Sequence, residues 1–282
     1  MKRILITGAN SYIGTCFENY IKENFSDEYS VDTVDMIGGA WREKSFSGYD
    51  SVVHVAGIAH RKETKENAHL YYEVNRDLAI QTANKAKADG AGQFIFLSSM
   101  SVYGMDTGVI TKQTAPNPKS HYGKSKLQAE DEIVPLGSEN FKVCVMRPPM
   151  VYGLGCRGNF NTVCKIVKKL PIFPRVKNER SMIYIDNLSS FIRLCIEKQL
   201  AGVYFPQNRE YVSTMDMARA ISQALDKKIY FEYLTGWAVS ILRLFYPTAK
   251  KAFGSLIYKG TEEFDFCYSE TENEKSFFMS VE

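Results

Sequence analysis

The chain has 282 residues, a formal net charge of +3 and 24% charged residues, so neither its composition nor its charge is typical of a nucleic-acid-binding protein. Its six cysteines are scattered without a C-x-x-C pair, which argues against a zinc site and a disulfide framework. No apolar run reaches the roughly 20 residues that a bilayer-spanning helix needs. We therefore expect a cytoplasmic protein with no metal, no nucleic-acid partner and no integral membrane segment.

A glycine-rich loop separates the first strand and the first helix that the pattern predicts. Residues 3–7 are a short apolar run, and residues 12–25 have helical periodicity. A strand, a glycine turn and a helix in this order are typical of dinucleotide binding, because glycine lets the backbone approach a pyrophosphate and the helix N-terminus supplies donors. The candidate cofactor-binding residues here are Gly8, Asn10, Ser11, Tyr12, Ile13 and Gly14.

A carboxylate ends the next predicted strand. The run 30–36 contains Asp35, about 20 residues after Gly14, where a carboxylate hydrogen-bonds the adenosine ribose hydroxyls and repels a 2'-phosphate. This position favours NAD, and Arg42 downstream leaves NADP open.

A buried strand at 51–56 ends in small residues. Ala56 and Gly57 would let a cofactor lie across the carboxyl edge of the sheet, so both are cofactor-binding candidates. His54 lies inside this strand, where a core histidine is a better interpretation than a catalytic one. Between the strands at 30–36 and 51–56, we expect a further strand near residues 37–49.

A long helix is predicted from Asn67 to Asp89, closed by Gly90. Its Asn75 is polar behind the expected active site, where an amide either holds a water or a backbone carbonyl or simply packs. The strand 93–97 then delivers residues 98–104 at its carboxyl end, the edge where an open parallel sheet places its chemistry.

Tyr122 and Lys126 lie four residues apart in a predicted helix. Residues i and i+4 share one helix face, so the phenol and the ammonium converge. A nearby ammonium favours phenolate, and we expect Lys126 to lower the pKa of Tyr122 from about 10. Such a tyrosine exchanges a proton with a sugar or alcohol hydroxyl. Taken alone, the pair is more typical of a solvated helix face.

Three segments together resemble a known family. They are T-G-A-N-S-Y-I-G (7–14), S-S-M-S-V-Y-G (98–104) and Y-G-K-S-K (122–126). In this order and spacing they are similar to the extended short-chain dehydrogenase/reductase superfamily and, within it, to the NAD-dependent nucleotide-sugar epimerase/dehydratase family, over roughly residues 1–210. Ser11 is a departure, since the family pattern T-G-x-x-G-x-x-G has glycine there and the serine must fit beside the cofactor phosphates.

The resemblance implies catalytic roles for Ser99, Tyr122 and Lys126. Ser99 would hydrogen-bond the reacting sugar oxygen and share its proton with Tyr122, and Lys126 would hold the nicotinamide ribose. Tyr122 and Lys126 therefore count among the cofactor-binding candidates as well. Hydride would pass between C4 of the sugar and the nicotinamide ring.

Met100 and Ser101 argue against one subclass of this family. Sugar-nucleotide 4,6-dehydratases resemble T-D-E-V-Y-G in this segment, and their Asp–Glu pair acts as acid and base in water elimination. A thioether cannot transfer protons, and serine without a base is a poor general acid. We therefore expect no dehydration.

The remaining motifs concern the substrate. Residues 147–153, R-P-P-M-V-Y-G, resemble the family's turn into a smaller substrate domain. The resemblance places nucleotide contacts near Asn159, where a helix N-cap is an equally good interpretation. Arg180 matches the family arginine that grips the diphosphate. Ser99, Asn159 and Arg180 are thus the substrate-binding candidates, and Asp186 is interpreted as a helix N-cap.

The alternation of strands and helices predicts an α/β fold: a doubly wound, Rossmann-type parallel sheet with a smaller C-terminal α/β substrate lobe. We place the NAD(P)-binding domain at residues 1–150 and a mainly substrate-binding lobe at 151–282, with the chain crossing back to the first domain near 180–200. The strand-like residues 202–205 are expected in the lobe.

The function we expect is that of an NAD-dependent nucleotide-sugar 4-epimerase, of the UDP-glucose 4-epimerase type, in polysaccharide or capsule sugar biosynthesis. An NAD(P)H-dependent reductase of 4-keto sugar nucleotides stays open, because R-P-P-M-V-Y-G resembles such enzymes equally. A third hypothesis is a non-catalytic NAD(P)-binding regulator. The Ser11 departure is compatible with this hypothesis, whereas the intact Ser99, Tyr122 and Lys126 argue against it. Relatives pair through helices matching 67–89 and 122–134, which implies a homodimer.

Overall fold

The computed structural model describes residues 1–59, 61–232, 253–261 and 267–281, with the side chains of Asn159 and Glu274 outside the description. The chain divides into two units. The first comprises residues 1–104, 115–148 and 189–206, and the second comprises residues 105–114, 149–188 and 207–282. Each unit is therefore assembled from three separate stretches of the chain.

The first unit is built on a six-stranded sheet in which every pairing is parallel. Its four central strands are buried along most of their length, because parallel strands are covered on both faces. In spatial order the strands are β10 (Gly202–Tyr204), β6 (Lys142–Met146), β4 (Gln93–Leu97), β3 (Ser51–His54), β1 (Lys2–Thr7) and β2 (Tyr29–Val34).

The direction of strand succession reverses beside β1. This strand pairs with β2 on one side and with β3 on the other, and the register sets Thr7 opposite His54. The crevice outside the carboxyl ends of β1 and β3 is therefore the topological switch point, where open α/β sheets bind their ligands. The segments that leave these two strands carry the candidates between Gly8 and Gly14, together with Ala56 and Gly57.

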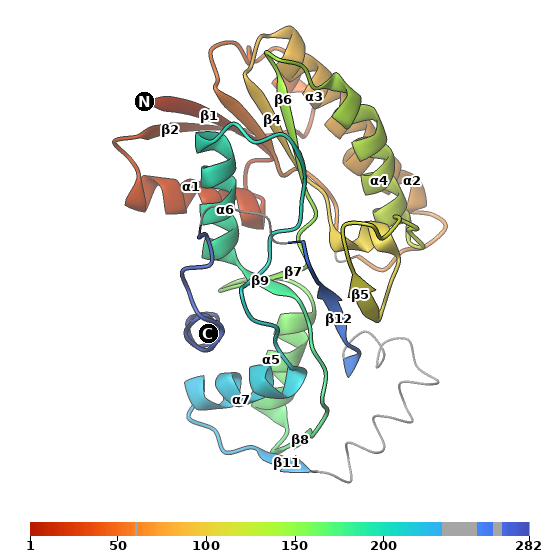
Figure 1. Ribbon diagram of the computed structural model, residues 1–282, viewed down its shortest axis with the longest axis vertical. Helices are drawn as coiled ribbons and strands as arrows, with labels where there is room; N and C mark the ends of the chain where they lie inside the picture. The colour runs from red at the N-terminus through yellow and green to blue at the C-terminus, as the bar shows by residue number, and fades with distance from the viewer. Residues whose placement is uncertain (60, 233–252, 262–266, 282) are drawn as a thin grey trace. The chain divides into compact units, whose positions relative to one another are not determined.

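Helices cover both faces of this sheet (Figure 1). The helix α1 (Tyr12–Asn24) and the part of α6 (Ile185–Glu197) that belongs to this unit lie on one face, and α3 (Leu78–Ala88) and α4 (His121–Ile133) lie on the other. Small residues let α3 and α4 approach the sheet closely. The buried cluster on that face includes Leu5, Val52, Ala79, Ala83, Ala86, Phe94, Phe96, Ala129, Ile133, Val143 and Val145. The expected α/β fold with a doubly wound parallel sheet is confirmed.

The helix predicted at 67–89 contains an irregular turn. It consists of α2 (Ala68–Tyr71), a π-helical turn η2 (Tyr72–Asp77) and α3. Turns of this kind are frequent at functional sites. Asn75 lies in this turn and is fully buried.

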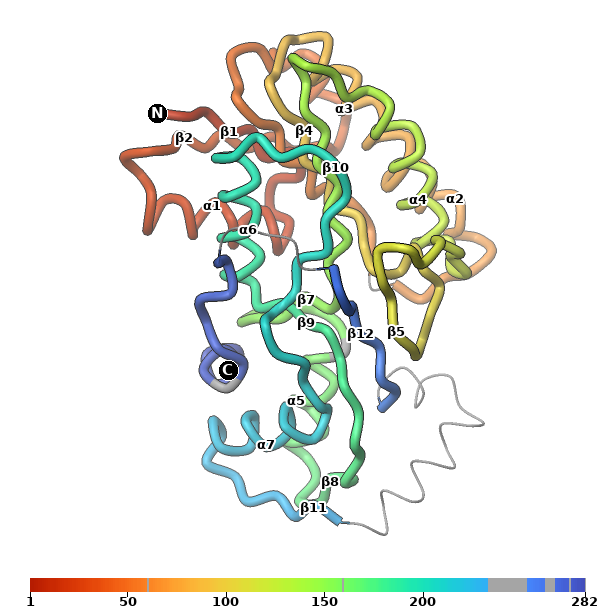
Figure 2. The backbone as a smooth tube through the Cα atoms, viewed as in Figure 1, coloured from red at the N-terminus to blue at the C-terminus, as the bar shows by residue number. Residues whose placement is uncertain are grey.

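The second unit holds small parallel two-stranded pairings and short helices. The strand β5 (Gly108–Ile110) runs beside β12 (Leu256–Tyr258), as Figure 2 shows. The other pairs are β7 (Met150–Tyr152) with β9 (Met182–Tyr184) and β8 (Ile172–Pro174) with β11 (Tyr230–Glu232). Among the described residues, the helices that lie wholly in this unit are α5 (Asn159–Lys169), α7 (Thr214–Ala224) and α10 (Asn273–Met279).

Three expectations about individual elements are wrong. Residues 35–50, all of them described, contain the 3₁₀ turn η1 (Ala40–Arg42) and loops but no strand. The strand at 202–204 joins the main sheet beside β6, not the lobe. Asp186 lies inside the first turn of α6 rather than at its N-cap. A three-residue strand does not reveal its sheet, because the pairing is decided by a partner far away in sequence.

Candidate active site

The glycine loop after β1 turns directly against the end of β3. Gly8 has a φ of +111°, and a Cβ there would lie 2.7 Å from the backbone nitrogen of Ala56. Only glycine fits a position that is both left-handed and this crowded. Asn10 follows with a φ of +64°, which asparagine tolerates better than most residues. The loop therefore crosses Ala56 and brings the N-terminus of α1 to the switch point.

Ser11, the departure from the family pattern, caps α1. Its Oγ accepts the backbone N–H of Gly14 at 3.2 Å, as an N-cap serine does. A Cβ on Gly14 would lie 2.6 Å from that Oγ, so the glycine makes room for the cap. The serine side chain is thus turned onto its own helix. Tyr12 and Ile13 form the first turn of α1 and are half-buried.

Asp35 directly follows β2 and is exposed. Its Oδ1 accepts the backbone N–H of Ile37 at 2.9 Å. Arg42 donates from Nη2 to Gln81 Oε1 at 2.9 Å, and its guanidinium carbon lies 4.7 Å from the centre of the Trp41 ring. The arginine is thus engaged with α3 and its own neighbour.

Asn75 fixes the loop that follows β3. Its Oδ1 accepts the N–H of Ile58 at 2.8 Å, and its Nδ2 donates to the carbonyl of the same residue at 3.1 Å. A Cβ on Gly57 would lie 2.9 Å from Asn75 Oδ1 and 3.5 Å from Lys126 Nζ. The amide therefore holds backbone groups, and Gly57 keeps a side chain away from the ammonium.

The start of α4 is capped twice. Ser120 Oγ accepts the N–H of Gly123 at 3.0 Å. The Glu63 carboxylate accepts the N–H groups of His121 at 2.9 Å and Tyr122 at 3.0 Å. Glu63 was not among the sequence-predicted residues, since it lies in a polar loop with no recognisable pattern. These contacts fix the helical turn that carries Tyr122.

Ser99 and Tyr122 are brought together at the carboxyl edge of the sheet. Ser99 caps the 3₁₀ turn η3 (Met100–Tyr103), where its Oγ accepts the N–H of Ser101 at 3.1 Å. Ser99 also lies near enough to the Tyr122 phenol to act on its pKa. A Cβ on Gly123 would lie 2.5 Å from the Ser101 carbonyl oxygen, so the glycine after Tyr122 lets α4 approach η3.

Lys126 lies one turn further along α4 and is 4% exposed. Its Nζ donates to the carbonyl of Leu97 at 2.7 Å and lies 4.6 Å from the centre of the Phe96 ring. Burial lowers the pKa of Lys126 to about 8, and the Glu130 carboxylate acts in the opposite direction. The side chain is therefore a buried cation whose pKa lies close to neutral pH.

The expectation that Lys126 lowers the pKa of Tyr122 is wrong for this structure. Burial raises the pKa of Tyr122 above its ordinary value, and the hydrogen bond from Ser99 lowers it only in part. The ammonium of Lys126 instead donates to the backbone of β4. Tyr122 is thus a phenol at neutral pH.

His54 is the core histidine that its place in the strand predicts. It is fully buried, and its Nδ1 lies 2.8 Å from Thr7 Oγ1. Burial, with a smaller effect of the Lys126 charge, lowers the pKa of His54 to about 3, so the ring is neutral.

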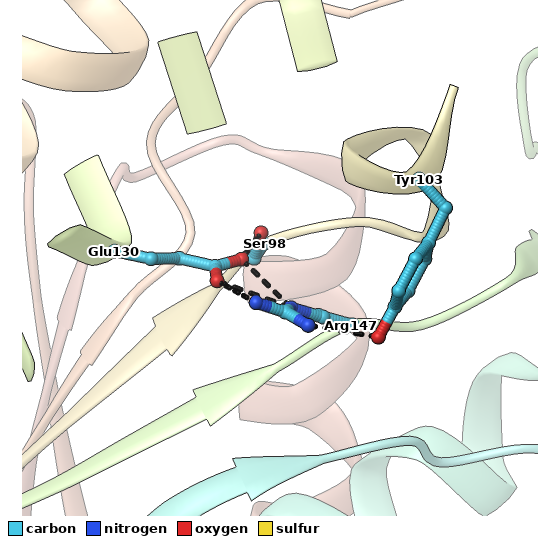
Figure 3. Close-up of polar contacts among 4 residues, drawn as sticks. All are labelled: Ser98, Tyr103, Glu130 and Arg147. Carbon is cyan, nitrogen blue, oxygen red and sulfur yellow. Dashed lines mark hydrogen bonds and ion pairs between the residues drawn. The ribbon is translucent and has the colours of Figure 1, made fainter. Parts of the chain in front are cut away.

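A buried ion pair behind the Ser99 segment was missed by sequence reasoning (Figure 3). Arg147, which directly follows β6, faces Glu130 on α4, and Ser98 and Tyr103 complete the group. The spacing Tyr122, Lys126, Glu130 is a signal that could have found the carboxylate, because residues i, i+4 and i+8 share one helix face.

The two remaining substrate-binding candidates belong to the second unit. Arg180 donates from Nη1 to the carbonyl of Gly254 at 2.9 Å, and its backbone bridges to Val212 and Leu256. Burial lowers the pKa of Arg180, and the Asp106 carboxylate raises it in part. Asn159 is the first residue of α5, and its side chain lies outside the description.

The described residues include neither a cluster suited to a metal ion nor a helix suited to span a membrane. No group of three or more histidine, cysteine, aspartate or glutamate side chains is placed to hold a metal ion there. Among the helices of this part of the chain, none has the length and apolar character needed to cross a membrane.

The sequence has relatives over most of its length. The sequence pattern of the NAD dependent epimerase/dehydratase family matches residues 4–231. A UDP-glucose 4-epimerase from Vibrio cholerae is 33% identical over 80% of this chain and 76% of its own length. An N-acetyl-α-D-glucosaminyl-diphospho-ditrans,octacis-undecaprenol 4-epimerase from Escherichia coli O157:H7 is 26% identical over 80% of this chain and 73% of its own.

Solved structures share the fold. A UDP-glucuronic acid 4-epimerase from Bacillus cereus, in complex with NAD, superposes with a TM-score of 0.75 at 20% identity, over 99% of this chain and 97% of that one. A dTDP-4-dehydrorhamnose reductase from Clostridium acetobutylicum superposes with a TM-score of 0.68 at 21% identity, over 82% and 83%. At this identity the likeness shows the fold alone, and it includes both epimerases and reductases.

Proposed function

This chain belongs to the NAD dependent epimerase/dehydratase family, and we propose that it is a 4-epimerase of a sugar carried on a nucleoside diphosphate. One observation carries the proposal. The Ser99 hydroxyl lies near enough to the Tyr122 phenol to lower its pKa in part, and Lys126 lies one helical turn further on. Met100 and Ser101 occupy the places where a dehydratase needs an acid and a base. The site can move one proton and lacks the pair that water elimination requires.

The residues around the switch point fit a dinucleotide. Gly8 lets the loop pack against Ala56, and Gly14 makes room for the Ser11 cap. This packing presents the N-terminus of α1 at the switch point, where its amides suit a pyrophosphate. Asp35 lies directly after β2, where it would accept hydrogen bonds from ribose hydroxyls. Because Arg42 is turned to Gln81, a 2'-phosphate would meet the Asp35 carboxylate first, which favours NAD over NADP.

NAD, when bound, supplies reversible hydride transfer at C4 of the sugar. The residues of the chain handle the proton and the geometry. Tyr122 exchanges the proton of the C4 hydroxyl, and Ser99 orients the same oxygen by its hydrogen bond. Lys126, whose ammonium is buried beside the end of β4, would hold the ribose next to the nicotinamide.

The substrate class follows from the diphosphate. The Vibrio cholerae relative is named for UDP-glucose, and the Escherichia coli relative is named for a sugar diphosphate on a polyprenol. In both, the sugar is attached through a diphosphate, for which the fork of an arginine such as Arg180 is well shaped. We assign Arg180 and Asn159 to this part of the substrate and take a nucleotide sugar as the first choice.

A test uses the purified full chain with UDP-, GDP- and dTDP-sugars and a polyprenyl-diphosphate sugar, each supplied with NAD and no reductant. The proposal predicts that one nucleotide sugar and its C4 epimer interconvert to the same equilibrium mixture from both sides, without net change in NAD. Stoichiometric consumption of NADH or NADPH with a 4-keto sugar would establish the reductase instead. Binding of NAD with no turnover of any sugar diphosphate would favour the regulator.

On the resemblance alone, we also propose a homodimer formed by the helices at 68–88 and 121–133, and a cytoplasmic location. Light scattering coupled to gel filtration at micromolar concentration tests the first, and a monomer mass contradicts it. Fractionation of cells that express a tagged full chain tests the second.

A further inference from the structure

The face of α4 that carries Tyr122 and Lys126 continues to a third polar residue. Glu130 lies four residues after Lys126, and its side chain is 3% exposed. A buried carboxylate is costly unless it is paired and hydrogen-bonded, so its presence on this face needs a reason. The mechanism proposed above does not use it.

The Glu130 carboxylate is bound by Ser98, which precedes Ser99 in the chain, and by Arg147 (Figure 3). Its carboxylate accepts a short hydrogen bond from Ser98 Oγ. It also accepts two hydrogen bonds from Nε of Arg147, at 3.1 and 3.2 Å, and a short one from Nη2 of the same guanidinium. Nη1 of Arg147 donates to the Tyr103 hydroxyl at 2.8 Å. The guanidinium thus links the carboxylate on α4 to the far end of η3.

These contacts tie the segment 97–103 to α4 at three points. Lys126 binds the carbonyl of Leu97, Glu130 binds the hydroxyl of Ser98, and Arg147 carries the connection from Glu130 to Tyr103. Ser99 lies between the second and third of these points. Its position relative to Tyr122 is therefore set by a network in which every link contains a charged side chain.

The same carboxylate faces the Lys126 ammonium across one turn of helix. The other titratable groups around Lys126 are neutral near pH 7. Burial lowers the pKa of His54 on β3 to about 3, and it raises the pKa of Tyr122 on α4 and of Tyr103 on η3 above 10. Glu130 is then the charged side chain that acts on Lys126 among the described residues, and it raises the pKa that burial lowers. Arg147 is paired with this carboxylate.

We propose that Glu130 and Arg147 are positioning residues of the active site: the pair fixes Ser99 against α4, and Glu130 is the counter-charge that keeps Lys126 protonated. This inference rests on the proposed function, because it assigns the pair to the work of Ser99, Tyr122 and Lys126. An ion pair that only stabilised the fold would leave kcat and its pH profile unchanged in variants that still fold. The two accounts therefore differ in a measurable property.

The first test measures the titration of Lys126 in the cofactor-free full chain. Lysine labelled with ¹³C at Cε is followed by NMR against pH, and the signal is assigned by its loss in Lys126→Met. In Glu130→Gln the Lys126 titration should move to lower pH by roughly one unit or more, because the opposite charge is gone. In Arg147→Met it should move to higher pH, because Glu130 then faces Lys126 alone. Asp131→Asn, an exposed neighbour on the same helix, should leave it unchanged.

The second test measures turnover of the substrate identified for the wild type. In Glu130→Gln the alkaline limb of the kcat profile should move to lower pH, and kcat should fall by roughly 10²-fold with KM little changed, since Ser99 is misplaced while the residues that bind the sugar diphosphate are intact. Ser98→Ala and Tyr103→Phe each remove one uncharged link and should lower kcat without shifting the limb.

The two tests give different results for the counter-charge role and the positioning role. Shifts of the Lys126 titration in opposite directions in Glu130→Gln and Arg147→Met support the counter-charge, and equal or absent shifts overturn it. If either charge variant does not fold, Ser98→Ala and Tyr103→Phe decide the positioning role, and an unchanged kcat in both overturns it. A wild type without turnover would instead refute the proposed function, while the NMR titration would still test the charge pairing.

Discussion

The helices α1 and α4 begin in the same way and differ in what covers their first turn. In each, a serine N-cap accepts the N–H of a glycine three residues later: Ser11 with Gly14 at 3.2 Å, and Ser120 with Gly123 at 3.0 Å. At α4 the Glu63 carboxylate binds two further amides. A protein carboxylate thus occupies the N-terminus of α4, which is the kind of site that binds an anionic ligand elsewhere.

The buried sides of the two helices differ as well. That of α1 consists of Gly14, Phe17 and Ile21, whereas that of α4 includes Lys126 and Glu130. An apolar buried face is sufficient for a helix whose N-terminal backbone amides bind a diphosphate. Proton exchange needs charge that is held away from water. The difference agrees with the proposal that α1 binds the anion and α4 carries the chemistry.

The largest expected effect concerns the phenol on α4. Tyr122→Phe removes the proton-exchanging group and keeps the ring that packs edge-on against Tyr71 at 6.5 Å. We expect kcat to fall about 10³-fold with little change in the melting temperature, because general acid–base catalysis contributes on that scale. The measurement is epimer interconversion at saturating NAD. Tyr72→Phe, which removes a neighbouring phenol that contacts His121, is the matched control and should stay within about twofold of wild type. Full activity in Tyr122→Phe would contradict the assignment.

The next effect tests the buried charge that distinguishes α4. Burial lowers the pKa of Lys126 from 10.5 to about 8 in the folded chain. Below pH 8 the lysine is protonated in both the folded and the unfolded chain, so folding includes the full free-energy cost of burying the ammonium. Between pH 8 and 10.5 the unfolded state binds more protons, and stability should rise with pH by about 3 kcal/mol from this group. Denaturant unfolding of wild type and Lys126→Met across this range measures the difference. A constant difference between the two proteins would show that the lysine is not a buried cation.

The smallest effect separates the two caps. Ser11→Ala and Ser120→Ala should each lower the free energy of unfolding by about 1 kcal/mol, and the loss at Ser120 should be the lesser because Glu63 still binds the first turn. Only Ser11→Ala should weaken NAD binding measured by calorimetry, and only Ser120→Ala should lower kcat at saturating NAD.

The N-cap of α7 offers the control for these caps. Ser213 Oγ accepts the N–H of Asp216 at 2.9 Å, so Ser213→Ala should cost similar stability without changing NAD affinity. Equal weakening of NAD binding in Ser11→Ala and Ser120→Ala would remove the distinction between the two helices.

The candidate site residues that could be predicted are those that stand in short sequence motifs. Ser99, Tyr122 and Lys126 stand in short motifs, and the structure places Ser99 and Tyr122 in contact. Glu63 could not be predicted, because it reaches α4 from a loop 58 residues earlier in the chain. Arg147 was visible in a motif, but its partnership with Glu130 depends on how β6 lies beneath α4.

The sequence by itself determined the strand from residue 93 to 97, the glycines of the loop 7–14, and the i, i+4 pairing on α4. These features depend on hydrophobic period and backbone sterics, which act over a few residues. Only the tertiary structure decided that the strand at 202–204 joins the main sheet, that Lys126 binds Leu97, and that the pKa of Tyr122 is raised. Pairing and burial depend on segments far apart in the chain, so their energies are set only when those segments meet.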